Sequence, residues 1–159
     1  KAAEQGYVTA QYNLGTLYHQ LGNSNLSFKW WKKAAEQGEA VSQFNLGKLY
    51  EAKKDQVQAF KWWYEAAKQG YTEAQSNVGG EYYNKGNKEQ AMLWWQKAAE
   101  QGLARAQYNL GVLCYEFGNN RQAAMWWEKA AAQDYPNAQN NLDVVGKLIH
   151  EDHSDRDAI

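Results

Sequence analysis

The chain has 159 residues, 44% of them hydrophobic, which is enough to bury a continuous core without disulfides or metals. Its 17 basic and 18 acidic residues nearly cancel, and this balance argues against nucleic acid as a partner, because such binding relies on excess positive charge. The single cysteine, Cys114, allows no disulfide within the chain, and no apolar run reaches the roughly 20 residues that span a bilayer. We expect a soluble chain without membrane insertion, whether cytoplasmic, periplasmic or secreted.

A 32-residue pattern recurs along the chain without gaps. It reads AQYNLGTLY from Ala10, SQFNLGKLY from Ser42, AQSNVGGEY from Ala74, AQYNLGVLC from Ala106 and AQNNLDVVG from Ala138. The four complete repeats and the half repeat that follows them span 7–38, 39–70, 71–102, 103–134 and 135–150. We predict one helical-repeat domain over 1–150 and a charged, disordered tail over 151–159.

The first predicted helix of each repeat has one face suited to burial. At about 100° per residue, this face in the first repeat carries Ala10, Gln11, Leu14, Leu17 and Tyr18, and the opposite face carries Thr9, Tyr12, Thr16 and His19. Glycines recur beside the buried face at Gly15, Gly47, Gly79 and Gly111. A missing Cβ lets a neighbouring helix approach closely, so these glycines predict tight packing between helices.

The second predicted helix of each repeat begins at a capping residue and carries a pair of tryptophans. The caps are Asn23, Asp55, Asn87 and Asn119, and the last three are followed by Gln58, Gln90 and Gln122 in the spacing of a capping box. The tryptophan pairs are Trp30 and Trp31, Trp62 and Trp63, Trp94 and Trp95, and Trp126 and Trp127. The second member of each pair shares a face with alanines and should fill the hairpin, whereas the first should reach the next repeat.

These elements predict an all-α fold, a right-handed α/α solenoid of helical hairpins. A final helix over about 137–150 should close the stack. It carries Asp143 and Gly146 where the other repeats mostly have glycine and tyrosine, so we expect it to act as a cap with a polar outward face.

The NLGxxY of the first helix and the KAAEQG that closes the second resemble the Sel-one-like repeat (SLR) family, a relative of the tetratricopeptide repeat. The family's usual unit is several residues longer between its helices, so the hairpin turn here should be short. The resemblance implies an adaptor or scaffold, commonly bacterial, that binds protein segments on the concave surface lined by the first helices.

The outward face of the first helices is therefore the predicted surface for binding another protein or a peptide. Its residues vary between repeats while the core positions mostly do not, as expected of a groove tuned to one partner, although any solvated face also varies. The candidate binding residues are Tyr12, Asn13, Phe44, Asn45, Lys48, Glu73, Ser76, Asn77, Gly80, Tyr83, Arg105, Tyr108, Asn109 and Tyr115.

An asparagine recurs at the flank of this face in every repeat, from Asn13 to Asn141. In tetratricopeptide domains a matching asparagine often holds the main chain or terminal carboxylate of a bound peptide, and a side-chain amide supplies both donor and acceptor. The alternative is a structural hydrogen bond to a neighbouring helix or loop in each repeat. Both interpretations remain open from the sequence.

Small residues predict a hollow on the outward face of the central repeat. Ser76 and Gly80 stand between repeats that carry larger side chains at the same positions, and Phe44, Tyr83 and Tyr108 should wall the space. We expect one bulky side chain of the partner to insert there, because such anchors dominate binding energy.

No motif in the chain indicates catalysis, a cofactor or a metal. Cys114 replaces a core-facing tyrosine, so we expect a buried and unreactive thiol. A metal site from His150, Asp152, His153 and Asp155 is conceivable, but these residues lie in the charged stretch after the repeats and are better interpreted as solvated.

Two other functions are compatible with the sequence. Leu93 and Met125 replace Lys29 and Lys61 on the outer face of the second helices, and the resulting apolar strip would suit an architectural solenoid that associates with itself. A small-ligand or hydrolase function would need a reactive group outside the repeat pattern, and none is found. We therefore expect a non-catalytic binding module.

Overall fold

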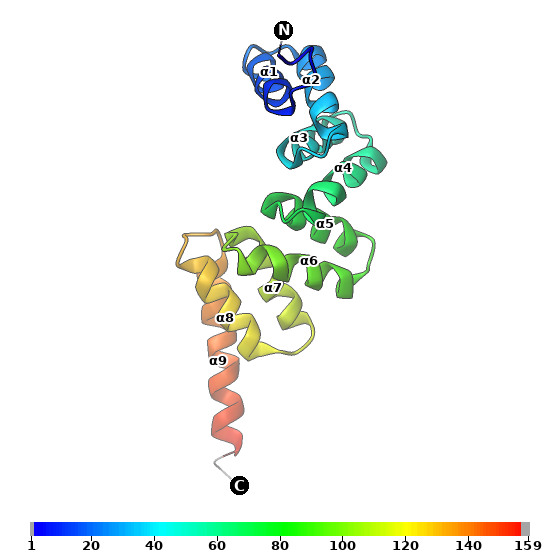
Figure 1. Ribbon diagram of the computed structural model, residues 1–159. Coiled ribbons are helices and arrows are strands. Elements are labelled where there is room, and N and C mark those ends of the chain that lie inside the picture. The colour runs from blue at the N-terminus through cyan, green and yellow to red at the C-terminus, as the bar shows by residue number, and fades with distance from the viewer. Residues whose placement is uncertain (1, 157–159) are drawn as a thin grey trace. The chain divides into compact units, whose positions relative to one another are not determined.

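The computed structural model describes residues 2–156 and the side chains as far as residue 149, and this part of the chain contains only helices and turns. The helices are α1 (Val8–Gln20), α2 (Ser24–Glu36), α3 (Ala40–Ala52), α4 (Gln56–Lys68), α5 (Thr72–Asn84), α6 (Lys88–Glu100), α7 (Ala104–Glu116), α8 (Asn120–Ala131) and α9 (Ala138–Arg156). The first eight form the four predicted hairpins, with short turns between the two helices of each (Figure 1). The predicted all-α solenoid of helical hairpins is confirmed.

The helices divide into two compact units. The N-terminal unit comprises Lys1–Val78 and the C-terminal unit Gly79–Ile159, with the boundary inside α5. In the N-terminal unit α1 packs on α2, α2 on α3 and α3 on α4, and in the C-terminal unit the same order runs from α6 to α9. Neighbouring helices thus make the contacts within each unit, as the repeat predicts.

The turns confirm most of the predicted helix ends. Asn23, Asp55 and Asn87 each accept a hydrogen bond from the backbone N–H three residues later, so these caps are formed. Asn119 makes no such bond, contrary to the prediction. Its predicted partner Gln122 instead faces Cys114, whose Sγ lies 3.8 Å from the Gln122 amide oxygen.

Each hairpin is filled by the second tryptophan of its pair, as predicted. The exposed fractions of Trp31, Trp63, Trp95 and Trp127 are 3%, 2%, 4% and 3%. A Cβ added at Gly15, Gly47, Gly79 or Gly111 would overlap the pyrrole edge of the indole of the same hairpin. The recurrent glycine therefore makes room for a ring of its own repeat.

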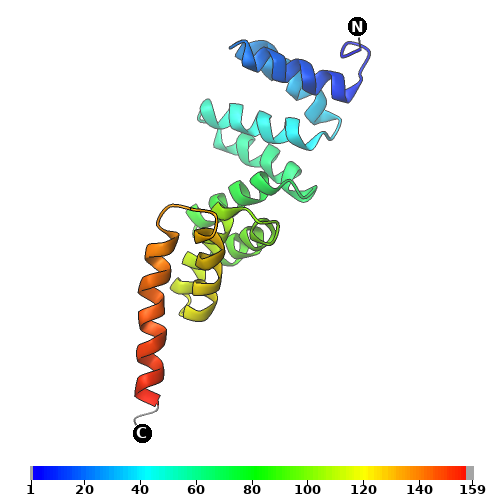
Figure 2. The same cartoon turned by 90° about the vertical axis from the view of Figure 1, so that its left-hand side faces the viewer.

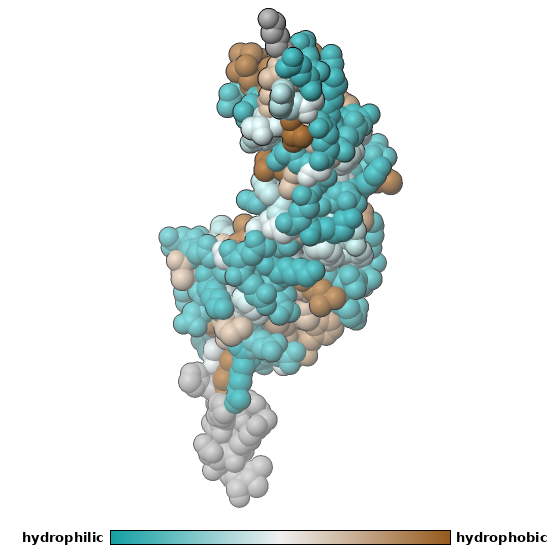
Figure 3. Space-filling model, viewed as in Figure 1, coloured by the Kyte–Doolittle hydropathy of each residue, from teal (hydrophilic) through white to brown (hydrophobic). Residues whose placement is uncertain are grey.

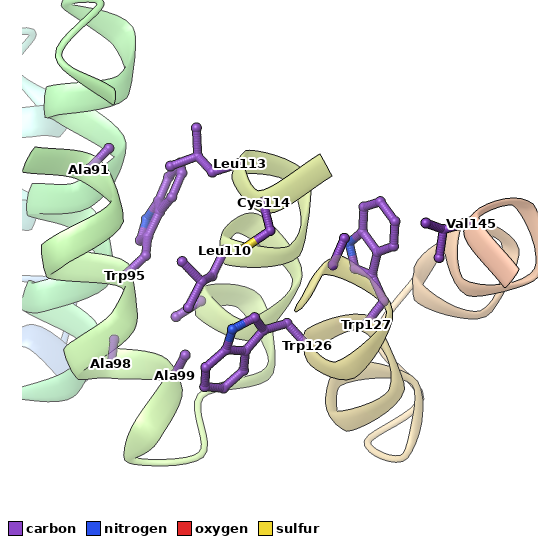
Figure 4. Close-up of a cluster of buried hydrophobic side chains, with 12 residues drawn as sticks. Ala91, Trp95, Ala98, Ala99, Leu110, Leu113, Cys114, Trp126, Trp127 and Val145 are labelled. Atoms are coloured by element: carbon purple, nitrogen blue, oxygen red, sulfur yellow. The ribbon is translucent and has the colours of Figure 1, made fainter. Parts of the chain in front are cut away.

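The direction predicted for the first tryptophan is wrong for the last pair. Figure 4 shows Trp126 on the side of Ala99, in the preceding repeat, and Trp127 on the side of Val145 in the following helix α9. Adjacent helical residues point about 100° apart, so Trp126 turns toward the preceding repeat rather than the next, while Trp127 fills its own hairpin as predicted.

A buried glutamine joins the first helix of each complete repeat to the segment that precedes it. The amides of Gln11, Gln43, Gln75 and Gln107 donate to the carbonyl oxygens of Ala3, Ala35, Ala67 and Ala99, at 3.1 to 3.3 Å. The side-chain oxygens of Gln11, Gln43 and Gln107 each accept from a second glutamine 26 residues later, for example Gln43 from Gln69 at 2.8 Å. Buried polar groups are thereby satisfied, and the recurring glutamines of the sequence have a structural role.

The last helix is longer than the sequence predicts. It continues beyond the α7–α8 hairpin and ends at Arg156 rather than near residue 150 (Figures 1 and 2). Asp143 accepts a hydrogen bond from Gln139 at 2.8 Å, and both side chains are exposed. Val144 and Leu148 of the same helix are also exposed, so its solvent-facing surface is polar only in part. The side chains of His150, Asp152, His153 and Asp155 lie outside the described residues. In the described part, no helix has the length and apolar character needed to cross a membrane.

Candidate binding surface

A hollow of about 360 Å³ surrounds Gly80 in the C-terminal unit. Its lining comes from the end of α5, the middle of α6 and the outward face of α7: Gly80, Tyr83, Asn84, Trp95, Tyr108, Asn109 and Val112. A Cβ added at Gly80 would meet no atom within 4 Å, whereas one at the adjacent Gly79 would overlap Trp95. Gly79 thus serves the core, and Gly80 opens the surface.

Aromatic rings form the walls of this hollow. The Tyr83 ring lies 5.4 Å from that of Trp95, and Tyr108 lies 5.1 Å from Tyr135 in the turn before α9. The Asn141 amide donates to the Tyr108 hydroxyl at 3.3 Å. Rings fixed by such contacts present an apolar surface with little side-chain entropy left to lose, which suits an interface anchor.

A polar cluster of Tyr83, Lys88 and Glu116 stands at the edge of the hollow. The Tyr83 hydroxyl donates to Glu116 Oε1 at 2.8 Å, and Lys88 Nζ lies 2.8 Å from Glu116 Oε2. The hydrogen bond from Lys88 lowers the pKa of Glu116, partial burial opposes this effect, and the hydrogen bond from Tyr83 adds to it. The hydrogen bond to Glu116 raises the pKa of Tyr83, and the one from Lys88 to Glu116 raises the pKa of Lys88.

A second, smaller hollow repeats the first. Its volume is about 210 Å³ and its lining is Val112, Tyr115, Trp127, Asn141 and Val144. Each of these residues lies one repeat after a residue of the first hollow, namely Gly80, Tyr83, Trp95, Asn109 and Val112. The larger size of the first hollow matches the presence of glycine rather than valine at position 80.

The structure brings four of the predicted binding residues together. Gly80, Tyr83, Tyr108 and Asn109 line the first hollow, and Tyr115 lines the second. Arg105 is exposed one turn before Tyr108. The sequence analysis did not include Trp95, Asn84, Lys88 or Glu116 in the site. Glu116 could have been noticed in the sequence, because it is the only carboxylate at its position of the repeat. The matching positions one repeat earlier, two repeats earlier and one repeat later carry Asn84, Ala52 and Leu148.

One predicted member of the surface is wrong. Ser76 is only 3% exposed, so its side chain is buried rather than on the surface, and it does not line the hollow. The other candidates belong to the N-terminal unit: Tyr12, Asn13, Phe44, Asn45, Lys48, Glu73 and Asn77. Among them the Phe44 ring lies 4.9 Å from that of Tyr71, with Lys48 Nζ 5.8 Å from its centroid.

The recurrent asparagines differ in their surroundings. The Asn141 amide makes an intramolecular hydrogen bond, which it donates to the Tyr108 hydroxyl. Asn109 is half-buried in the first hollow, and no bond to its amide occurs within the described residues. The last repeat thus supports the structural interpretation, while Asn109 is available to a partner.

Within the described part of the chain, the remaining candidates for chemistry do not form a site. Cys114 is 2% exposed, and burial raises the pKa of its thiol, so the reactive thiolate is disfavoured. Within the described residues, no three histidine, cysteine, aspartate or glutamate side chains are placed to hold a metal ion.

Leu93 and Met125 are 53% and 42% exposed on the second helices. The face in Figure 3 is mainly hydrophilic, with only small hydrophobic patches.

Comparison with known proteins places the chain among the helical-repeat proteins. The Sel1 repeat matches residues 8–39, 40–71, 72–103 and 104–135, so the chain belongs to the Sel1 repeat family. These matched ranges begin one residue after the predicted repeats. No significant match was found among curated protein sequences.

Solved structures share this architecture. The antigen c5321 of uropathogenic Escherichia coli, described as a protective antigen with an SLR fold, is 34% identical with a TM-score of 0.79, over 89% of this chain and 34% of that one. A Sel1 repeat protein from Oxalobacter formigenes is also 34% identical with a TM-score of 0.75, over 87% and 63%. PilF of Pseudomonas aeruginosa, at 20% identity and a TM-score of 0.67 over 95% and 72%, shares the fold. The chain thus spans about a third of the length of the Escherichia coli antigen and under two thirds of that of the Oxalobacter formigenes protein.

Proposed function

We propose that this chain binds an extended protein segment on the outward face of its first helices, with a bulky apolar side chain of that segment in the Gly80 hollow. Sel1 and tetratricopeptide-like repeat proteins are generally protein-interaction modules, and their fold is typically a non-catalytic scaffold. The observation that carries the proposal is the hollow itself, which measures about 360 Å³ and has aromatic walls. Gly80 opens it, whereas the next repeat has Val112 at the matching position.

The chemistry of the lining favours a polypeptide over a charged small ligand. Tyr83, Trp95, Tyr108 and Val112 supply apolar surface, and an apolar side chain entering among them would leave water. The Asn109 amide has a donor and an acceptor to offer beside that surface. An extended backbone presents both groups in alternation, so one asparagine can hold it in register.

Selection from a library of random peptides displayed on phage tests this function. We expect the selected peptides to share one bulky apolar residue and to lose at least tenfold in affinity on Gly80→Trp, which fills the hollow. Asn109→Ala should weaken binding by about 1–3 kcal/mol if the amide pairs with the peptide backbone. Thr16→Trp is the matched control, because it introduces the same ring at the equivalent position of the first repeat.

Thermal unfolding of both tryptophan variants should stay close to that of the parent, since a Cβ at Gly80 has open space around it. Peptides that bind the Gly80→Trp and Asn109→Ala chains as tightly as the parent would refute the proposal. The exposed Leu93 and Met125 would then become the surface to test. Self-association through them predicts a molar mass that rises with concentration and falls on Leu93→Lys.

A further inference from the structure

The polar cluster beside the Gly80 hollow departs from the 32-residue pattern. It consists of a tyrosine at position 83, a lysine at 88 and a glutamate at 116. The matching residues two repeats earlier are His19, Ser24 and Ala52. The matching residues one repeat later are Tyr115, Asn120 and Leu148. Neither of these sets provides both a carboxylate and a cation at the matching positions. Core packing is common to all repeats and therefore does not explain the cluster.

Helix electrostatics do not explain it either. Glu116 is the last residue of α7, where the negative end of the helix dipole disfavours a carboxylate, and Lys88 is the first residue of α6, where the positive end disfavours a cation. Each charge is unfavourable for its own helix. Their contact, with 2.8 Å between Lys88 Nζ and Glu116 Oε2, offsets that cost and leaves Glu116 Oε1 for the Tyr83 hydroxyl.

The second hollow shows the same tyrosine without this support. Tyr115 stands one repeat after Tyr83 and lies 5.8 Å from Trp127, compared with 5.4 Å between Tyr83 and Trp95. Leu148 takes the place of Glu116 there and offers no acceptor. Tyr115 is 41% exposed, whereas Tyr83 is half-buried, so the unsupported ring is the more exposed of the two.

We infer that Glu116 is a positioning residue, held by Lys88, that fixes the Tyr83 ring against Trp95 as a rigid wall of the Gly80 hollow. This inference rests on the proposed function and adds how the hollow is kept ready for its ligand. A wall that is ordered before binding does not have to lose side-chain freedom on binding, which favours affinity. The hollow at Val112 lacks this arrangement and should be less selective.

The position of Tyr83 can be measured without any ligand, by NMR of the chain labelled with 13C at the tyrosine ring carbons. In the parent, the Cζ shift of Tyr83 should differ from that of Tyr115, because only the Tyr83 hydroxyl donates to a carboxylate. Glu116→Leu introduces the residue that the next repeat carries, and it should move the Tyr83 shift toward that of Tyr115. Glu116→Gln keeps an acceptor oxygen and should retain most of the difference.

Indole serves as a probe of the hollow, with binding followed by the Gly80 amide shift. Tyr83→Phe and Glu116→Leu should each weaken indole by about two- to tenfold. The double variant should be no weaker than the worse single variant, because both changes break one contact. Tyr115→Phe is the control and should leave binding at Gly80 unchanged, and circular dichroism checks that each variant is folded.

Two results would overturn the role of Glu116: a Tyr83 shift unaffected by Glu116→Leu, or effects of the two single variants that add in the double variant. Failure of the proposed function looks different. If indole shifts no signal at Gly80, or selected peptides ignore Gly80→Trp, the hollow is not a binding site, and the tyrosine signals still decide what Glu116 does.

Discussion

At the scale of single residues, two adjacent glycines in α5 have opposite tasks. Gly79 leaves room for the Trp95 indole inside the hairpin, and Gly80 leaves an open space on the surface. The sequence alone predicts the first task, because that glycine recurs beside the buried face in every complete repeat. The hollow at Gly80 was also predictable from the larger residues at the same position in neighbouring repeats. Its polar edge was predictable only at Glu116, which departs from the matching residues of the other repeats, because no single repeat contains Tyr83, Lys88 and Glu116 together.

Alanine substitutions separate the two glycines. Gly79→Ala should destabilise the chain by about 1–3 kcal/mol, because the new methyl group overlaps a buried ring. Gly80→Ala should stabilise it by about 0.5–1 kcal/mol, because alanine has the higher helix propensity and the position is open. Urea unfolding of the two variants measures both changes, and equal effects of the two substitutions would contradict the assignment.

Lys54 is a residue in a conformation that favours glycine. Its φ is 61°, and the equivalent Gly22, Gly86 and Gly118 have φ between 72° and 77°. Lys54→Gly should therefore stabilise the chain by about 0.5–1 kcal/mol, since a left-handed conformation costs an L-residue energy. The reciprocal Gly22→Lys should lose a similar amount, and melting curves of both variants provide the comparison. A loss of stability in Lys54→Gly would show that the lysine side chain contributes more than the backbone costs.

At the scale of helices, the repeat predicted the pairs and most of their ends, and it was least accurate where one repeat departs from the others. The predicted cap at Asn119 does not form, and in the same repeat the side chain of Gln122 faces Cys114, which replaces the tyrosine of the other complete repeats. The direction of Trp126 was misjudged because helical periodicity gives the angle between two side chains but not which neighbouring repeat a side chain meets. The glutamine contacts between helices need the three-dimensional structure to be seen.

The contact among α5, α6 and α7 predicts a dependence of stability on pH. The pKa of Glu116 in the folded chain lies below its usual value of 4.5, so its contribution is present above that value and is lost as the pH falls through the folded pKa. The difference in melting temperature between the parent and Glu116→Gln should thus be largest near neutral pH and shrink below about pH 4.5. Glu100→Gln controls for the change in net charge, and a gap that stays constant from pH 7 to 3 would exclude this linkage.

At the scale of the whole molecule, the chain consists of two compact units, each stabilised by contacts between neighbouring helices. In such arrays stability is close to a sum of repeat and interface terms, so damage in one region need not unfold all of it. The sequence predicted the array and its four complete repeats but gave no sign of the division inside α5, because the 32-residue spacing continues through it without a gap.

Trp63 is the largest fully buried side chain of the N-terminal unit, and it tests this independence. Trp63→Ala should cost about 3–5 kcal/mol, because a buried ring leaves a cavity. Hydrogen exchange should show the loss of protection in α3 and α4 with much less change in α8. A cost below about 1 kcal/mol would mean that the ring contributes little to the core, and uniform loss across the chain would mean that the array unfolds as one body.

The glutamine contact has a consequence for how the length of such a chain can change. Gln43 meets the Ala35 carbonyl eight residues before it and the Gln69 amide 26 residues after it, and the first, third and fourth repeats keep the eight-residue spacing. Insertion of one residue within a helix would rotate the later side chains of that helix by about 100° and separate the partners on either side of it. Duplication or loss of one whole repeat in phase would instead rejoin a glutamine to an equivalent alanine. Gene rearrangements that add or remove whole repeats should therefore be tolerated where single-residue insertions in the helices are not.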